Sequence, residues 1–191
     1  MKINAYHSHL QSGIFLMAGL LFVSAFAGLA NAQGRSPWTS AGSTGTVDED
    51  SQSIVNLSSF AVSHAVGQTG SIHVRYNISA TDNVSFFCPA TQSVVKVRFR
   101  NSDNSGATAR LTFEIHSTNI ATGGNTTDFS FSSDGIGAGI GFTSVMFTPA
   151  IDFDFANRVY WIEATLFRSD ASQRVDLGSI QIYENAGAAC R

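Results

Sequence analysis

The chain has 191 residues, of which 13% are charged and 43% hydrophobic, and its formal net charge at pH 7 is −3. Charged residues make up about a quarter of an average globular protein, so most of this surface must be polar without being charged. The 3 Pro, 17 Gly and 2 Cys exclude a collagen and a disulfide-dense miniprotein, the apolar content excludes wholesale disorder, and the net charge provides no general attraction for nucleic acid.

Residues 1–32 have the features of a secretory signal peptide. Lys2 supplies a positive charge, residues 14–29 are almost wholly apolar or small, and residues 30–32 (Ala-Asn-Ala) form a small-x-small cleavage site. The apolar run is shorter than the roughly 20 residues of a helix that spans a bilayer. We therefore predict cleavage before Gln33 and a secreted, periplasmic or extracellular mature chain without a membrane span. An uncleaved N-terminal anchor is the alternative.

Residues 33–53 are expected to form a flexible or loosely docked leader before a single domain at 54–191. The leader is rich in Gly, Ser and Thr and carries an acidic run at 48–50, a composition typical of flexible segments. Its one large apolar side chain, Trp38, has no explanation in a flexible segment.

Alternation of apolar and polar residues with period two dominates the rest of the chain. It predicts half-buried strands at 71–79, 94–100, 108–117 and 128–132. The segment 101–107 (NSDNSGA) consists of turn-forming residues, so we expect the strands on either side of it to pair as a hairpin.

The glycine-rich run 135–141 does not fit a nucleotide-binding loop. Such a loop needs a helix N-terminus after it to hold phosphate, whereas residues 142–147 have the pattern of a strand. We expect a flexible loop between strands, with a membrane-inserting hairpin as the alternative because the run carries no charge.

Asp152, Asp154 and Asn157 form a candidate metal site. On a strand the two carboxylates would share one face, with the amide just beyond them, and clustered oxygens of this kind suit a hard cation such as calcium. The alternative is a solvated strand edge that discourages pairing with another strand. No cofactor other than calcium is indicated.

Two further strands are predicted near the end of the chain, at 158–168 and 174–184. The first is apolar on both faces, which leaves Trp161 either covered by a second layer or exposed as an anchor for a ligand. In the second, the parity of the apolar residues changes at Gly178, where a β-bulge would restore the register.

The strands and the lack of a long amphipathic helix predict an all-β fold. We expect a single antiparallel β-sandwich, jelly-roll or immunoglobulin-like, after an N-terminal signal helix.

Cys88 and Cys190 are the only cysteines, and in an exported chain we expect them to form a disulfide. Their bridge would close a loop of about 100 residues and contribute up to about 4–5 kcal/mol in the chain-entropy model. Two free thiols are the alternative.

Four basic residues are expected to share one surface. Lys96, Arg98 and Arg100 lie on one face of a strand, and Arg110 would lie beside them on the other strand of the predicted hairpin. Such a surface suits an anionic ligand, such as a sulfated or acidic glycan or a lipid headgroup. The alternative is a solvated outer face on which Glu114 is the local partner.

We predict a non-enzymatic exported protein that binds an extracellular ligand, such as a glycan, through its surface. Trp161 and the four basic residues are the candidate ligand surface. The sequence contains no nucleophile elbow and no H-E-x-x-H metalloprotease motif. A structural or self-assembling, pilin-like subunit and a small secreted hydrolase are the alternatives; we expect no nucleic-acid partner and leave self-association open.

Overall fold

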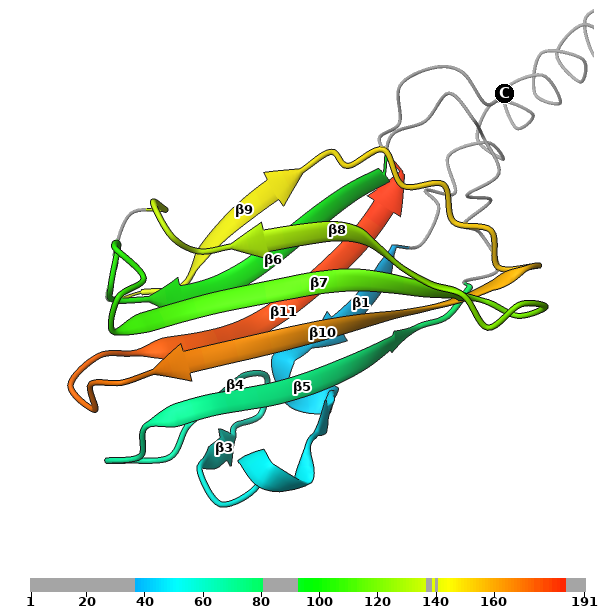
Figure 1. Cartoon of the computed structure of the whole chain (residues 1–191). Helices are drawn as coiled ribbons and strands as arrows, with labels where there is room; N and C mark the ends of the chain where they lie inside the picture. Colours follow the sequence, from blue (N-terminus) through cyan, green and yellow to red (C-terminus); the bar gives the residue numbers. More distant parts are fainter. Residues whose placement is uncertain (1–36, 81–92, 137–138, 140, 185–191) are drawn as a thin grey trace, which may run out of the picture. The chain divides into compact units, whose positions relative to one another are not determined.

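The computed structural model describes residues 37–80, 93–136, 139 and 141–184. Within these ranges the chain forms two antiparallel β-sheets that pack face to face, which confirms the predicted all-β sandwich (Figure 1). The segment 1–32 and both Cys88 and Cys190 lie outside the described residues, so the signal peptide and the disulfide stay predictions. None of the described helices has the length and apolar character that crossing a membrane requires.

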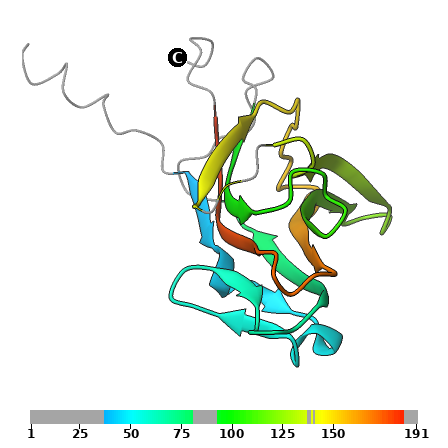
Figure 2. The ribbon, with the colours of Figure 1, turned by 90° about the vertical axis from the view of Figure 1, so that its left-hand side faces the viewer.

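One sheet, which we call sheet A, has six strands. Five of them are, in order across the sheet, β3 (Val55–Leu57), β4 (Val62–His64), β11 (Val175–Glu184), β6 (Ser93–Asn101) and β9 (Thr143–Phe147). The sixth strand, β1 (Trp38–Ala41), also pairs with β11. Figure 2 shows β9 in yellow at the upper side of the sandwich and the cyan segment with β3 and β4 at its lower side.

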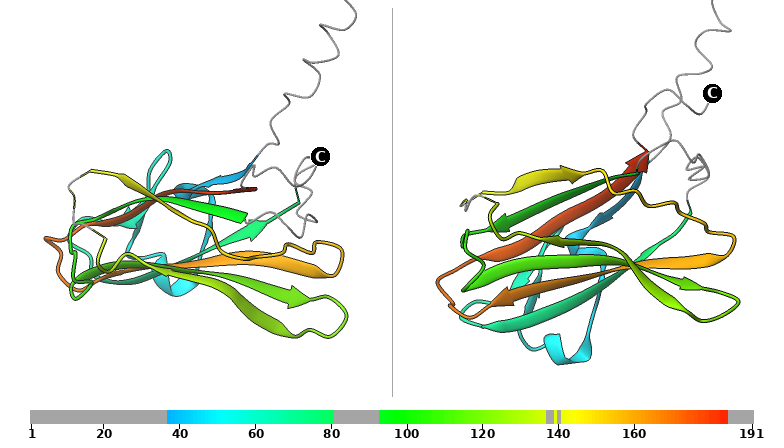
Figure 3. Two further views of the ribbon diagram at one scale, coloured as in Figure 1. Left: turned by 90° about the horizontal axis from the view of Figure 1, so that it is seen from above. Right: turned by 45° about the horizontal axis from the view of Figure 1, so that its top comes forward.

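The other sheet, sheet B, has five strands, and its two long central members carry the site described below. In order across the sheet they are β2 (Thr46–Val47), β5 (Gly70–Ile78), β10 (Arg158–Arg168), β7 (Ala109–Asn119) and β8 (Asn125–Ser132). The left-hand view of Figure 3 shows the two sheets as separate layers. Two short 3-10 helices, η1 (Gly42–Thr44) and η2 (Glu49–Ser51), lie between the first strands of the chain.

The period-two pattern determines which side chains fill the space between the layers. In β5, β7 and β10 every second residue is buried, as the alternation predicts, because successive side chains point to opposite faces of a sheet. The largest fully buried side chains include Phe99, Phe113, Ile115, Ile162 and Ile180. The residues between them form the two outer faces of the sandwich.

The predicted bulge at Gly178 is present. The pairing register between β11 and β6 shifts between Leu177 and Ser179. A Cβ atom on Gly178 would lie 3.0 Å from the ring of Phe142 and 3.1 Å from the carbonyl oxygen of Arg98. Both distances are tighter than ordinary van der Waals contacts, so a larger residue at the bulge would require its neighbours to shift.

The predicted hairpin of 94–100 with 108–117 is wrong. β6 belongs to sheet A, where it pairs with β11 and β9, whereas β7 belongs to sheet B, where it pairs with β10 and β8. The turn-forming segment therefore carries the chain from one layer to the other. The alternation and the turn residues are equally compatible with a hairpin in one sheet and with a crossing between two sheets. Neither pattern specifies which strand lies beside another.

Side-chain hydrogen bonds hold the chain in this crossing between layers. The carboxylate of Asp103 accepts hydrogen bonds from the hydroxyl of Ser105 at 2.7 Å, and from the backbone N–H and hydroxyl of Thr108. These bonds, first that from Ser105, hold the pKa of Asp103 well below its usual range. The buried amide of Asn101 donates to the hydroxyl of Ser133 at 2.9 Å, so the two sheets are connected by a polar contact at this end.

The expected flexible leader is wrong for the part of it that the structure describes. Trp38 is only 7% exposed and belongs to the core, and its strand β1 pairs with residues 179–182 of β11. Further along, Tyr76 donates a 2.6 Å hydrogen bond to the carbonyl oxygen of Gly42, and Ser51 is fully buried. The Gly- and Ser-rich composition therefore reflects close packing of backbone rather than flexibility.

Candidate functional site

The structure divides the predicted ligand surface between the two faces of the sandwich. Trp161 and Arg110 lie on the outer face of sheet B, whereas Lys96, Arg98 and Arg100 lie on β6, on the outer face of sheet A. The expected neighbourhood of Arg110 with the three other basic residues is therefore wrong. Arg110 is separated from them because the chain crosses from one layer to the other after β6.

The outer face of sheet B is an ordered array of side chains, because β5, β10 and β7 run side by side in a continuous register. Residues that lie abreast on the three strands have their side chains on the same face. From one end of β10 to the other, the rows are Asn77–Trp161–His116, Arg75–Glu163–Glu114, His73–Thr165–Thr112 and Ser71–Phe167–Arg110. Two aromatic side chains of β10, Trp161 and Phe167, are thus surrounded by polar side chains on this face.

Trp161 is half-buried, and the described strands form two layers only, so no third layer of them covers it. The sequence left open whether a further layer covers Trp161 or whether it is exposed as an anchor. The described part of the chain contains no such layer over Trp161. Its indole ring stacks on the imidazole of His116, with ring centroids 5.2 Å apart and an interplanar angle of 21°. The stacking restricts the orientation of the indole, which leaves an aromatic side chain at a fixed place on an open face.

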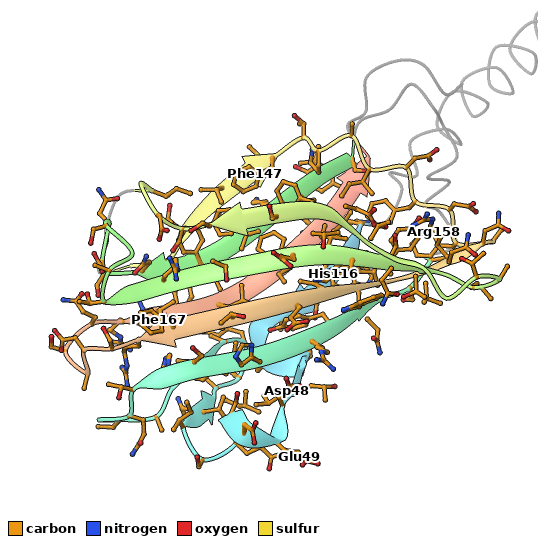
Figure 4. All side chains as sticks on the ribbon, viewed as in Figure 1. Asp48, Glu49, His116, Phe147, Arg158 and Phe167 are labelled. Carbon is orange, nitrogen blue, oxygen red and sulfur yellow. The ribbon has the colours of Figure 1, made fainter. Side chains whose placement is uncertain are left out.

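His116 is itself fixed by hydrogen-bonding partners on two strands. Its Nδ1 lies 3.1 Å from the hydroxyl of Thr127 on β8, and its Nε2 lies 3.2 Å from a carboxylate oxygen of Glu114. Figure 4 labels His116 near the middle of the face. The imidazole is therefore a rigid support for the indole rather than a freely rotating side chain.

The arginines of this face are neutralised by carboxylates. Arg75 lies 3.8 Å from Asp48 and 3.9 Å from Glu163. Arg110 lies 3.6 Å from Asp134 and over the ring of Phe167, 5.9 Å from its centroid. Figure 4 labels Phe167 on β10 and Asp48 below β5. The arrangement suits a ligand without net charge that offers both an apolar surface and hydrogen-bonding groups.

The candidate calcium site does not have the expected geometry. Asp152, Asp154 and Asn157 lie in the loop before β10, not on a strand. The carboxylate of Asp154 accepts a 2.8 Å hydrogen bond from the side-chain amide of Asn157 and further bonds from backbone N–H groups, so it caps a turn. In the described part of the chain no three His, Cys, Asp or Glu side chains gather as a metal site would need.

The same loop is held to β10 by Tyr160. Its hydroxyl accepts a 2.8 Å hydrogen bond from the backbone N–H of Asp154 and donates one of 3.2 Å to the carbonyl oxygen of Asp152. Burial raises the pKa of Tyr160, which keeps the hydroxyl protonated as this pair of bonds requires. The polar residues of the loop therefore serve its conformation.

Sequence reasoning missed the partners of the basic residues on sheet A. Phe142 lies over the bulge at Gly178, beside Arg98 and Arg100, and Phe60 lies against it. The side chain of Arg100 forms an ion pair with Asp176, which is almost completely buried. The signal in the sequence for this arrangement was the glycine at the parity change, since a glycine within a strand often marks a place where another group approaches the backbone closely.

No protein-family model and no curated protein sequence matches the chain. Among solved structures it is similar to a xylan-binding module CBM15, with 16% identity and a TM-score of 0.47 over 82% of this chain and 100% of that one. It is also similar to TmCBM61 in complex with β-1,4-galactotriose (8% identity, TM-score 0.40, 78% and 88% covered). A third similar structure is the CBM22-1 xylan-binding domain from Paenibacillus barcinonensis Xyn10C (13%, 0.39, 82% and 99%).

Proposed function

We propose that this chain is a non-catalytic binding protein whose outer face of sheet B holds an uncharged carbohydrate. The observation that carries the proposal is Trp161, a half-buried aromatic side chain on an outer face that is held in place by the stacked imidazole of His116. A ring that is already oriented loses little conformational entropy when a ligand covers it.

The groups around Trp161 match the chemistry of a sugar. A pyranose ring has an apolar face of C–H groups that packs on an aromatic ring, and hydroxyls around its edge that need hydrogen-bonding partners. Asn77 lies abreast of Trp161 on β5, and Glu163 and Arg75 form the next row. These side chains offer both donors and acceptors within two residues of the indole along the strands.

The carboxylates of this face are assigned to hydrogen bonding rather than to catalysis. Glu114 and Glu163 lie opposite each other on β7 and β10, and each has a basic side chain beside it. The side chain of Glu114 is 50% exposed, on an open sheet face. General acid and base catalysis gains from a site that excludes water, which an open face does not provide.

Export is part of the proposal. The signal peptide predicted for residues 1–32 would place the chain outside the cytoplasm, where polysaccharides are accessible as ligands. The low proportion of charged residues suits a face that makes its contacts through rings, hydroxyls and amides.

A glycan array probed with the purified full chain and its Trp161→Ala variant tests the proposal. We expect the wild type to bind one or more uncharged oligosaccharides and the variant to bind them at least about tenfold more weakly, since a central aromatic anchor contributes on the order of 1–2 kcal/mol or more. Ile120→Ala is the matched control, because Ile120 is 61% exposed in the turn between β7 and β8. Equal binding by Trp161→Ala, no binding of any glycan, or turnover of a bound glycan would each contradict the proposal.

A further inference from the structure

The outer face of sheet A carries a second built surface, which we call the Phe142 platform: Phe60, Phe142, Arg98 and Arg100. The rings of Phe60 and Phe142 are 5.4 Å apart at an angle of 55°. The guanidinium carbons of Arg98 and Arg100 lie 5.6 Å and 5.0 Å from the centroid of Phe142. Three side chains from two other parts of the sequence therefore converge on the ring of Phe142.

The backbone makes room for this platform. Phe142 lies against Gly178, where a Cβ atom would lie 3.0 Å from the ring. The bulge of β11 and the glycine at its centre thus create the seat for an aromatic side chain beside the basic residues of β6. Phe60 is 46% exposed, and Phe142 is half-buried, so both rings of the platform keep some surface in contact with solvent.

The positive charge of the platform is only partly neutralised. Asp176 pairs with Arg100, and both side chains are largely withdrawn from solvent. Arg98 is exposed, and Lys96 lies two residues before it on the same face of β6. Among the side chains that the structure describes, no ion pair involves Arg98 or Lys96.

We infer that the Phe142 platform together with Lys96 binds an acidic polysaccharide. The carboxylate or sulfate groups of the polymer pair with Arg98 and Lys96, and its sugar rings lie against Phe142 and Phe60. The two cations are spaced by about 6.8 Å along the strand, since each residue of a strand advances about 3.4 Å. The contacts of Arg98 and Arg100 with the ring restrict their guanidinium groups before any ligand arrives.

The number of free cations favours a polysaccharide over other polyanions. Duplex DNA binding commonly neutralises about 6–10 phosphates, and recruitment to an anionic membrane uses clusters of about 4–8 basic residues. Two free cations beside two aromatic rings are too few for either partner. They suit a polymer that carries isolated charges on apolar ring faces, and the net charge of −3 opposes dense polyanions over the rest of the surface.

Binding of the full chain to polygalacturonate and to dextran sulfate, with neutral dextran as the uncharged reference, tests this inference. We expect binding to at least one acidic polymer, no binding to dextran, and weakening as the salt concentration rises, because exposed ion pairs are screened. The Arg98→Gln variant should lose about fivefold in affinity, the amount expected for one partly exposed ion pair. Arg98→Lys, which keeps the charge, should retain most of the binding and shows that the site still folds.

Arg110→Gln is the matched control, because Arg110 is also an exposed arginine over a phenylalanine ring but is paired with Asp134 on the other sheet. It should bind the acidic polymers like the wild type. Trp161→Ala should also leave this binding unchanged, which separates a failure here from a failure on sheet B. Equal loss in Arg98→Gln and Arg110→Gln, equal binding to neutral dextran, or binding only to duplex DNA or to phosphatidylserine vesicles would overturn the inference.

Discussion

The two outer faces of the sandwich differ in how far their basic side chains are paired with carboxylates. On sheet B, Arg75 and Arg110 each lie within 4 Å of a carboxylate, and the central aromatic side chain stacks on a histidine. On sheet A, Asp176 neutralises one of three basic residues in a row, and the aromatic ring lies under the guanidinium groups. Aromatic side chains are available on both faces, so the balance of charge around them decides which ligands each face can hold.

This difference depends on the crossing of the chain between the layers. Had β6 and β7 paired, Arg110 would lie next to Arg98 and Arg100 and would compete with Arg100 for Asp176. Because β7 belongs to the other sheet, Arg110 pairs with Asp134 and Arg100 pairs with Asp176. Four changes would break or sharpen the comparison.

Truncating the shared core should have the largest effect, because both faces rest on it. Phe99 is 1% exposed, lies on β6 between Arg98 and Arg100, and its ring contacts Phe131 of sheet B at 5.6 Å. Phe99→Ala should lower the free energy of unfolding by about 3–5 kcal/mol, the usual cost of a large cavity. Urea unfolding measures this change. A loss below about 1 kcal/mol would mean that the two sheets do not share one core at this point.

Filling the bulge should disturb sheet A and spare sheet B. Gly178→Ala places a methyl group 3.0 Å from the ring of Phe142, and we expect a loss of about 1–3 kcal/mol through overpacking. The affinity for acidic polymers should fall, whereas binding at Trp161 should persist. Thermal unfolding and the two binding assays together check this. A variant as stable as the wild type, with the platform intact, would contradict the assigned seat of the ring.

Acid should weaken the crossing between the layers. The pKa of Asp103 is lower in the folded chain than in the unfolded one, so its stabilising contribution is complete above the ordinary carboxyl pKa and is lost as the pH falls toward the folded value. Asp103→Asn removes this titration. Between about pH 6 and about pH 3, the urea midpoint of the wild type should therefore fall more than that of the variant. Parallel pH profiles would show that Asp103 does not contribute.

Removing the indole should have the smallest effect on folding. Trp161 is half-buried on an outer face, so Trp161→Ala should change the free energy of unfolding by about 1 kcal/mol or less, although it removes the proposed anchor. Thermal unfolding of the variant beside Ile120→Ala measures the difference. A loss of about 3 kcal/mol or more would identify Trp161 as a covered structural residue and would remove the main support for a binding role of sheet B.

Several features were predictable because they depend on short stretches of chain. Alternation placed Ile162 and Trp161 on opposite faces of their strand, and the parity change in the last strand predicted the bulge at Gly178. The buried Trp38 was misjudged, because its neighbours have the composition of a flexible segment and its packing partner, β11, lies about 140 residues later in the chain.

The sequence by itself determined the fold class and the face on which each strand residue lies, since successive side chains of a strand always alternate. Only the tertiary structure decided which strands are neighbours, and with them the partners of every charged group. Arg110 and Arg98 have the same local pattern, yet one pairs with Asp134 and the other lies over Phe142. Alternation follows from the geometry of a single strand. The neighbours of a strand, in contrast, are selected by the packing of the whole core and by hydrogen bonds that hold the turns between strands, such as those that Asp103 accepts.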